Sequence, residues 1–171
     1  RGVRGLVVSS AGFKEVGGAG IERERLLRAA LDRYGMRMIG PNCMGVLNTE
    51  PAFQLNASFA RTRPIPGNIG FMSQSGALGE AILAIAARKG IGFSMFVSVG
   101  NKTDVGGNDL LQYWEHDAAT DLILLYLENF GNPRRFTEIA RRITRRKPIL
   151  AVKAGRTAAG ARAVSSHTGV L

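Results

Sequence analysis

The sequence predicts an α/β protein built around a mostly parallel sheet, and three observations lead to this class. Strand-like and helix-like patterns take turns along most of the chain, which is typical of parallel sheets with helical connections. Leu122–Leu127 is apolar almost throughout, as expected of a strand that is covered on both faces. The chain has 171 residues, of which 45% are hydrophobic and 21% charged, which suits one sizeable core or two small ones.

The first part of the chain predicts a strand, a helix and a second strand. Gly5–Ser10 is expected to be a buried strand, and a glycine-rich loop follows it. A helix is expected over Ile21–Tyr34, with Leu26, Leu27, Ala30 and Leu31 on one side, and Gly35 ends it. Met36–Ile39 predicts the next short strand.

Pro41–Pro66 shows no sustained periodicity and contains four prolines, so we expect a linker or surface loop there. The domain division that follows is residues 1–48, a linker at 49–66, and a second domain from 67 to 171. The chain ends shortly after a histidine motif with no closing element, so we expect it to be a segment of a longer polypeptide.

The second part repeats the alternation more fully. Its expected strands are Asn68–Ser73, Phe93–Val99, Leu122–Leu127 and Ile149–Lys153. Its expected helices are Ala77–Arg88, Asn108–His116 and Pro133–Arg146.

The formal net charge is +10, but its distribution argues against nucleic-acid binding. Much of the excess lies on or beside one predicted helix without interleaved aromatic residues, at Arg134, Arg135, Arg141, Arg142, Arg145, Arg146 and Lys147. A solvated helix face explains it, and attraction to anionic small molecules is also compatible. No apolar run has the length of a membrane span, and the single Cys43, interpreted as a small buried residue, fits a reducing cytoplasm.

Polar and small residues follow several predicted strands, and in such sheets ligands collect at the carboxyl ends of the strands. Ser73, Gln74, Ser75 and Gly76 join a strand to a helix whose first N–H groups suit an anion, although a capped turn without ligand would look the same. Gly100–Gly107 either binds a phosphate or acyl group or is a plain flexible loop.

Glu128 ends an apolar strand at this same edge, where its carboxylate could orient an imidazole; an exposed acid at a strand end is the alternative. His167 lies between hydroxyl residues and a glycine, in the run Ser165–Gly169, and could carry a phosphoryl group. His116 sits at a helix end among charged neighbours, which favours a solvated role. The spacing of two histidines and one cysteine predicts no metal site.

In the first part, Ser9 and Ser10 follow a strand and Asn42 follows the next, so these residues could contact a nucleotide-like ligand. The glycine fingerprint of dinucleotide-binding dehydrogenases is absent, which counts against an oxidoreductase.

Five motifs in order carry a resemblance to a known family: Gly40–Thr49, Gly67–Gly76, Ser98–Asp104, Tyr126–Glu128, and Lys153–Arg156 through Ser165–Gly169. The chain resembles the NDP-forming acyl-CoA synthetases, relatives of the succinyl-CoA synthetase alpha chain. The resemblance implies that residues 1–48 are the last portion of a Rossmann-like CoA-binding domain and that residues 67–171 belong to a flavodoxin-like CoA-ligase domain.

In that family an acyl-CoA reacts with phosphate to give an acyl phosphate, and a histidine passes the phosphoryl group to ADP in an ATP-grasp domain. The resemblance implies that His167 is the phosphorylated histidine and Glu128 its supporting carboxylate. Ser73, Gln74, Ser75 and Gly76 would bind the phosphoryl group, and Ser9, Ser10 and Asn42 would contact CoA or support the site.

The implied cofactors and substrates are CoA, phosphate, a carboxylic acid, and ATP or ADP with Mg²⁺ in an ATP-grasp domain outside this chain. The resemblance also implies an oligomer in the cytoplasm. The same domains occur fused to protein acetyltransferases, where they sense CoA ligands, and that regulatory role is the alternative.

Overall fold

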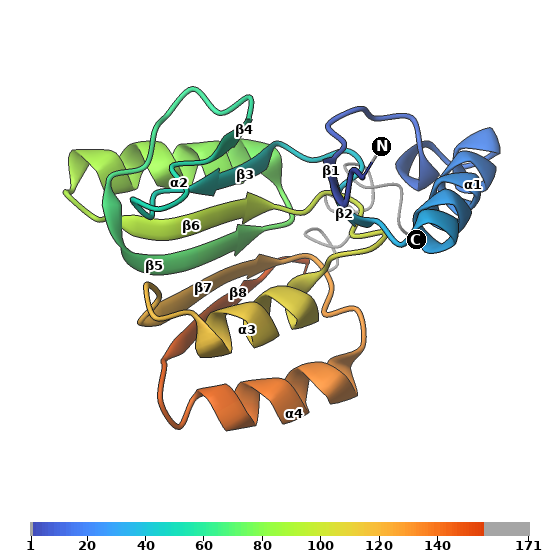
Figure 1. The fold of residues 1–171 in the computed structure, drawn as a ribbon. Coiled ribbons are helices and arrows are strands. Elements are labelled where there is room, and N and C mark those ends of the chain that lie inside the picture. The colour runs from blue at the N-terminus through green and yellow to red at the C-terminus, as the bar shows by residue number, and fades with distance from the viewer. Residues whose placement is uncertain (1, 156–171) are drawn as a thin grey trace.

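The computed structural model describes residues 2–155, which form two sheets of very different size (Figure 1). The small sheet pairs β1 (Gly5–Val7) with β2 (Arg37–Ile39) in parallel. The large sheet is six-stranded, in the order β4-β3-β6-β5-β7-β8. Its strands are β3 (Gly45–Asn48), β4 (Asn56–Ser58), β5 (Pro66–Ser73), β6 (Phe93–Ser98), β7 (Leu122–Leu127) and β8 (Ile149–Lys153). The mostly parallel α/β class predicted from the sequence is confirmed.

Within the large sheet, β6, β5, β7 and β8 run parallel, and β3 is antiparallel to both β4 and β6. The carboxyl ends of the parallel strands therefore meet at one edge. In Figure 1 their arrowheads point toward the small sheet and its helix α1 (Ala19–Tyr34). A single turn of 3₁₀ helix, η1 (Lys14–Val16), precedes α1.

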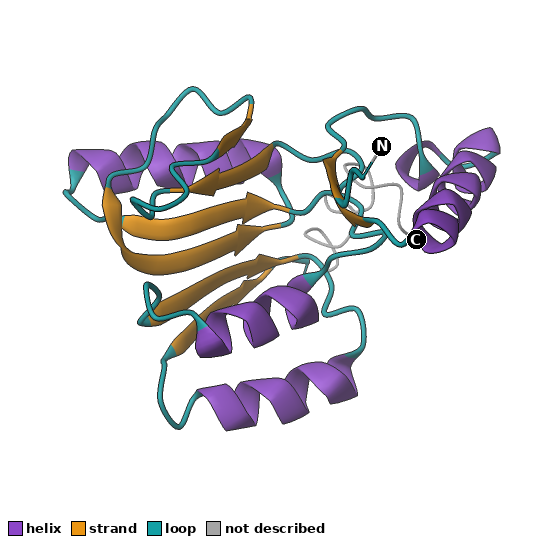
Figure 2. Ribbon diagram, in the orientation of Figure 1, coloured by secondary structure: helices purple, strands orange, loops and turns teal. Residues whose placement is uncertain are grey.

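Helices cover the large sheet on both faces, as Figure 2 shows. Helix α2 (Gly76–Arg88) lies on one face, and helices α3 (Gly107–His116) and α4 (Pro133–Ile143) lie on the other. The α2 side encloses a core that includes Phe71, Leu83 and Phe96. The opposite core includes Met72, Leu125 and Trp114, the last of which is fully buried. A strand buried on both faces needs apolar residues at nearly every position, which explains the uninterrupted apolar run of β7.

Helix ends follow the capping rules of their sequences. The Ser75 hydroxyl accepts a hydrogen bond from the Leu78 N–H at 3.3 Å and caps α2. The Asn132 side chain caps α4 through the Arg135 N–H at 3.0 Å, with Pro133 in the first turn. Gly35 ends α1 in the left-handed conformation, with φ of 61°.

Pro41–Pro66 was expected to be a linker or surface loop without strands, and this expectation is wrong. The segment contains β3 and β4, and both strands belong to the large sheet. These strands have 4 and 3 residues, which is too short for a period to emerge between the prolines. Helix α4 also ends earlier than expected, at Ile143 instead of Arg146. Its Thr144 hydroxyl bonds back to the Ala140 carbonyl at 2.9 Å.

In the first part, the predicted burial of the first strand is wrong, and of the four residues predicted on one side of α1, Leu31 is buried and Leu27 and Ala30 are half-buried. In β1, Gly5 and Val7 are exposed and Leu6 is only half-buried, because among the described residues β1 pairs with β2 alone. In α1 the buried residues are Gly20, Glu24 and Leu31, whereas Leu26 is 54% exposed. The face of α1 that packs therefore includes an acidic residue, which an apolar pattern does not detect.

Two exposed arginines of the arginine-rich helix α4 form ion pairs. Arg142 forms a two-pronged ion pair with Glu115 of α3, at 2.6 Å for each contact, and Arg134 pairs with Glu138 at 3.3 Å. The Lys147 ammonium donates to the carbonyls of Trp114 and Asp117. No helix in residues 2–155 is long and apolar enough to cross a membrane.

Candidate functional site

A cavity of about 610 Å³ opens at the carboxyl edge of the large sheet, between that edge and the small sheet. It is lined from the first part of the chain by Ser9, Lys14, Asn42 and Cys43, and from the second part by Gln74, Gly76, Lys102, Glu128 and Asn129, among others. The structure thus brings five of the predicted residues to one place: Ser9, Asn42, Gln74, Gly76 and Glu128.

The turn between β5 and α2 is held by its own serines. The Ser73 hydroxyl is fully buried and donates to the Ser75 carbonyl at 2.6 Å. Ser75 has extended backbone angles and caps α2, as described above. Gly76 begins the helix at the cavity wall and Ala77 also lines the cavity, so the positive end of the α2 dipole lies at the cavity. This arrangement suits an anion.

Gln74 connects this turn to the strand end that carries Glu128. Its side-chain oxygen accepts hydrogen bonds from the N–H groups of Glu128 at 2.7 Å and Asn129 at 3.0 Å. The backbone N–H of Gln74 donates to the Tyr126 carbonyl at 3.1 Å. Because Gln74 is buried, these bonds fix where the backbone leaves β7, and they place the half-buried Glu128 at the cavity.

The loop Gly100–Gly107 is not a free loop, because its side chains attach the large sheet to the first part of the chain. The Asp104 carboxylate accepts bonds from the Met38 N–H at 2.7 Å, Arg28 at 3.0 Å and Arg37 at 3.0 Å. Burial raises the pKa of Asp104, but the bonds from Arg37 and Met38 outweigh it and the net pKa is lowered. Only 7% of this side chain is exposed.

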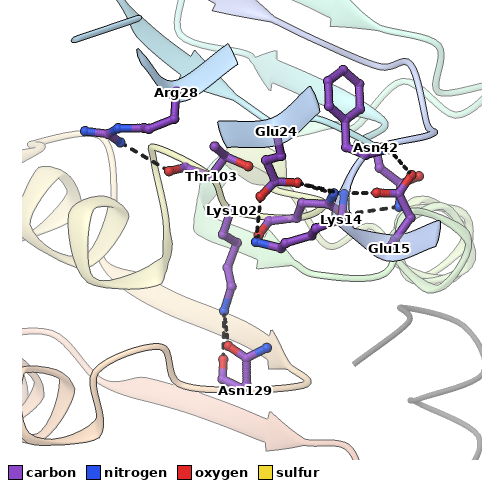
Figure 3. Close-up of polar contacts among 10 residues, drawn as sticks. Lys14, Glu15, Glu24, Arg28, Asn42, Lys102, Thr103 and Asn129 are labelled. Carbon is purple, nitrogen blue, oxygen red and sulfur yellow. Dashed lines mark hydrogen bonds and ion pairs between the residues drawn. The ribbon is translucent and has the colours of Figure 1, made fainter. Parts of the chain in front are cut away.

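A second polar group is centred on Asn101 and includes Lys14, Glu15, Glu24 and Asn42, which Figure 3 labels. The Asn101 amide donates to Glu15 at 2.6 Å and Glu24 at 2.9 Å, and its oxygen lies 3.3 Å from the Asn42 amide nitrogen that donates to it. The Lys14 ammonium lies 2.8 Å from Glu24 and donates to the Asn101 carbonyl at 2.8 Å. Burial raises the pKa of both glutamates, yet the hydrogen bonds prevail and hold each net pKa below its usual value.

Lys102 is the cation of this loop that reaches the cavity. Its ammonium donates to the backbone carbonyl of Asn129 at 2.9 Å and to the Asn129 side chain at 2.6 Å. Burial and the nearby positive charge of Lys14 lower the pKa of Lys102 to about 8, against a smaller opposite effect of Glu128. The contacts tie the end of β6 to the end of β7.

The other predicted residues have different positions. Ser10 is not among the residues that line the cavity; its carbonyl accepts the Asn42 N–H at 2.9 Å and so supports Asn42. Cys43 is buried, as predicted, and its thiol donates to the Val8 carbonyl at 3.3 Å. Burial raises its pKa to about 11, which makes it a poor nucleophile. His167 and the run Ser165–Gly169 lie outside the described residues.

Sequence reasoning missed the residues that join the two parts of the chain, which are Lys14, Glu15, Glu24 and Asp104, and it missed Asn129, which joins the ends of β6 and β7. Glu24 and Glu15 lie on or beside a helix whose pattern looks solvent-facing, and their partner Asn101 is 77 or more residues away in sequence. Asp104 offered a usable signal, since it follows a strand and belongs to the motif Ser98–Asp104. No group of three His, Cys, Asp or Glu residues able to hold a metal occurs within residues 2–155.

Comparison with known proteins adds a family to this geometry. A sequence profile described as "Succinyl-CoA ligase like flavodoxin domain" matches residues 66–171. The chain is 48% identical to the ADP-forming acetate–CoA ligase I of Archaeoglobus fulgidus over 99% of its own length and 24% of that enzyme. It is 45% identical to subunit alpha of the ADP-forming acetate–CoA ligase II of Pyrococcus furiosus, over 100% of the chain and 37% of the subunit.

Among solved structures, dinucleotide-forming acetyl-coenzyme A synthetase 1 of Ca. Korarchaeum cryptofilum, in complex with phosphate and ADP, superposes with a TM-score of 0.91. The two are 46% identical, and the match covers 99% of this chain and 36% of that one. The chain thus spans between about a quarter and about two fifths of the proteins it matches. It belongs to the family of succinyl-CoA ligase like flavodoxin domains.

Proposed function

We propose that this chain is the phosphohistidine-bearing segment of an ADP-forming acyl-CoA synthetase. One observation carries the proposal: the α2 N-terminus, the buried Gln74 and Glu128 converge on one cavity, in a chain 48% identical to an ADP-forming acetate–CoA ligase. The retention of a histidine motif at Ser165–Gly169 supports it.

The reaction proceeds in three steps. Phosphate attacks the acyl-CoA carbonyl, the C–S bond breaks, and CoA leaves with formation of an acyl phosphate. An imidazole nitrogen of His167 then takes the phosphoryl group and releases the carboxylic acid. Finally ADP takes the phosphoryl group from His167, which yields ATP.

The residues of the cavity have distinct parts in this scheme. The N–H groups of the first turn of α2, with Ser73, Gln74, Ser75 and Gly76 around them, stabilise the charge of the transferring phosphoryl group. Glu128 accepts a hydrogen bond from the N–H of the His167 imidazole nitrogen that does not take the phosphoryl group, and so holds the ring in one tautomer. Ser9 and Asn42, supported by Ser10, lie where a CoA group would enter from the first part of the chain.

The complete enzyme needs parts outside this chain. Residues 1–48 would be the end of a CoA-binding domain, 49–66 its connection, and 67–171 the beginning of the ligase domain, although β3 and β4 already pair within the large sheet. An ATP-grasp domain, in the same polypeptide or in a partner subunit, would hold ADP or ATP with Mg²⁺ in a cytoplasmic, oligomeric enzyme. The relatives include acetate and 4-hydroxybutyrate ligases, so the acyl group we propose is that of a small carboxylic acid.

Phosphorylation of the full-length protein tests the proposal. Incubation with radiolabelled ATP and Mg²⁺ should give an acid-labile label that the His167→Asn variant lacks. His116→Asn is the matched control, because His116 is 84% exposed at the end of α3 and its variant should keep the label. Glu128→Gln should slow labelling by about 10–100-fold. Wild-type protein that binds acyl-CoA but takes no label would instead indicate the regulatory role.

A further inference from the structure

Lys102 combines a position inside the cavity with an amine that is already oriented. It lines the cavity together with Gln74 and Glu128, and Figure 3 shows its side chain reaching from the Gly100–Gly107 loop to Asn129. Its backbone is in the left-handed region, with φ of 57°, a conformation that costs a non-glycine residue energy and persists only where the surroundings impose it. The two hydrogen bonds to Asn129 hold the half-buried side chain at the site.

The hydrogen bonds of the amine leave one position of the nitrogen unused. Both bonds go to Asn129, at 2.6 Å and 2.9 Å, and among residues 2–155 the nitrogen has no third hydrogen-bond partner. A neutral amine carries two N–H bonds and one lone pair. It can therefore keep both bonds to Asn129 while its lone pair remains available to an electrophile in the cavity.

The surroundings of Lys102 raise the fraction of this neutral form above that of an ordinary lysine. Burial and, to a smaller extent, the charge of Lys14 in η1 lower its pKa to about 8, while Glu128 acts in the opposite direction. Asp104 of the same loop, together with Asp109 and Arg135, lines a smaller cavity with it, and these residues carry charges of both signs. An amine with this pKa is about half deprotonated at pH 8, whereas one at the ordinary value of 10.5 is almost fully protonated.

We propose that Lys102 is a site of covalent acylation by the enzyme's own acyl donor, a thioester or an acyl phosphate bound in the cavity. The inference rests on the proposed function, which supplies that donor. The amine nitrogen attacks the acyl carbonyl carbon, a C–N bond forms, and the C–S bond of the thioester or the C–O bond to phosphate breaks. The leaving thiolate or phosphate takes the electron pair, and the proton lost by nitrogen goes to it or to water.

Acylation changes the contacts that hold Asn129. The amide product is uncharged and has one N–H, so Lys102 can keep only one of its two hydrogen bonds to Asn129. Asn129 directly follows Glu128, so the carboxylate loses part of its support. Acylation of Lys102 therefore lowers turnover when acyl donor accumulates.

The test uses the full-length protein with acetyl-CoA or acetyl phosphate as separate probes, and peptide mass spectrometry as the readout. Lys89, exposed at the end of α2, is the internal reference. At pH 8 the larger fraction of free amine outweighs the weaker nucleophilicity of a less basic nitrogen, so Lys102 should acylate about tenfold faster than an ordinary lysine. Desulfo-CoA should suppress the acetyl-CoA arm, and inorganic phosphate the acetyl phosphate arm.

Two variants separate this inference from the proposed function. His167→Asn should still acylate at Lys102, because the step needs a bound acyl donor and no phosphohistidine. During incubation with donor, the turnover of wild type should decline, whereas the turnover of Lys102→Arg should stay at its own starting value. Acylation of Lys102 no faster than that of Lys89, or unaffected by both competitors, overturns the inference. If Lys102 is not selectively acylated but His167 is phosphorylated in the same sample, the inference on Lys102 is wrong and the proposed function is still supported.

Discussion

The side-chain amide of Gln74 connects the ends of two strands that are distant in sequence. Its oxygen accepts two backbone N–H groups beyond β7, and the side chain is 8% exposed. A buried N–H group that loses its acceptor costs about 1–3 kcal/mol. Gln74 thus has a measurable structural role in addition to the phosphate-binding role that we propose.

Substitution of Gln74 separates these two roles. Gln74→Met should lower the free energy of unfolding by about 2 kcal/mol, because it leaves two N–H groups unpaired. Gln74→Glu keeps the acceptor and should lose less stability, yet its negative charge should lower phosphate affinity. Urea unfolding and the KM for phosphate measure the two effects. The matched control is Gln112→Met, whose amide makes one bond within α3, to the Asn108 carbonyl at 3.1 Å. Equal losses at both positions would contradict the argument.

Gly100 allows the loop after β6 to pass close to the first part of the chain. Its φ is +54°, and a Cβ atom there would lie 2.2 Å from the Pro41 carbonyl oxygen and 2.3 Å from that of Asn42. The contact brings Asn42 beside Asn101 at the cavity. A side chain at position 100 would have to push these backbones apart.

Gly100→Ala should therefore destabilise the protein by more than about 3 kcal/mol, on the order of a severe core defect. Gly90→Ala is the control, because Gly90 has a φ of +69° but a Cβ atom added there would meet no other atom within 4 Å. Only the cost of the left-handed conformation, about 1–2 kcal/mol, then applies. Thermal unfolding of the two variants should differ clearly. Similar melting temperatures would mean that the loop yields and that the close approach is not required.

At the level of elements, the N-terminus of α2 depends on one hydroxyl. Ser75 caps the helix, and an N-cap serine contributes about 1 kcal/mol to helix stability. Ser75→Ala should cost about that amount and should also slow phosphohistidine formation, because the first turn would fray at the cavity. Asn132→Ala removes the corresponding cap of α4 and should cost a similar amount with a smaller effect on labelling. If both variants label equally fast, the α2 terminus does not serve the phosphoryl group.

Helices and strands with a clear apolar pattern were predictable from the sequence, whereas strands that depend on pairing with a distant strand were not. The run Leu122–Leu127 and the strands around it match the structure, since burial on both faces imposes their composition. Strands β3 and β4 carry no such signature, because β3 is specified mainly by its pairing with β6. In this pairing Gly45 lies opposite Ser98 and Asn48 lies opposite Met95. Likewise the positions of Ser73, Gln74 and Glu128 followed from strand ends, whereas the contacts of Asn101 depend on how two sheets meet.

For the molecule as a whole, the cavity exists because the first part of the chain is fixed against the large sheet. Asp104 is the charged centre of that junction: it accepts bonds from Arg28 and Arg37, and from the Met38 N–H of the small sheet. The carboxylate is nearly buried while its arginine partners are partly exposed, at 44% and 62%. The ionised form of one residue therefore helps to hold both walls of the site in place.

This junction should weaken in acid. The folded-state pKa of Asp104 lies below its ordinary value of 3.8, so its stabilising effect is fully present above that value and is lost as pH falls through the folded pKa. Protection of the Met38 amide from hydrogen exchange should drop accordingly below about pH 4. Asp104→Asn should reduce this protection at pH 7 by an amount equivalent to about 2 kcal/mol and should flatten its acid dependence.

Asp32→Asn provides the comparison, because Asp32 pairs with Arg28 at 2.8 Å but is 59% exposed. An exposed ion pair contributes roughly 0–1 kcal/mol, so this variant should leave Met38 protection and its pH profile nearly unchanged. If Asp104→Asn and Asp32→Asn changed the protection of Met38 equally, the loss of any negative charge near Arg28 would explain the effect, and the specific bonds of Asp104 would not. A selective effect at Asp104, accompanied by weaker CoA binding, would show that the small sheet must be held at the carboxyl edge for the cavity to accept its ligand.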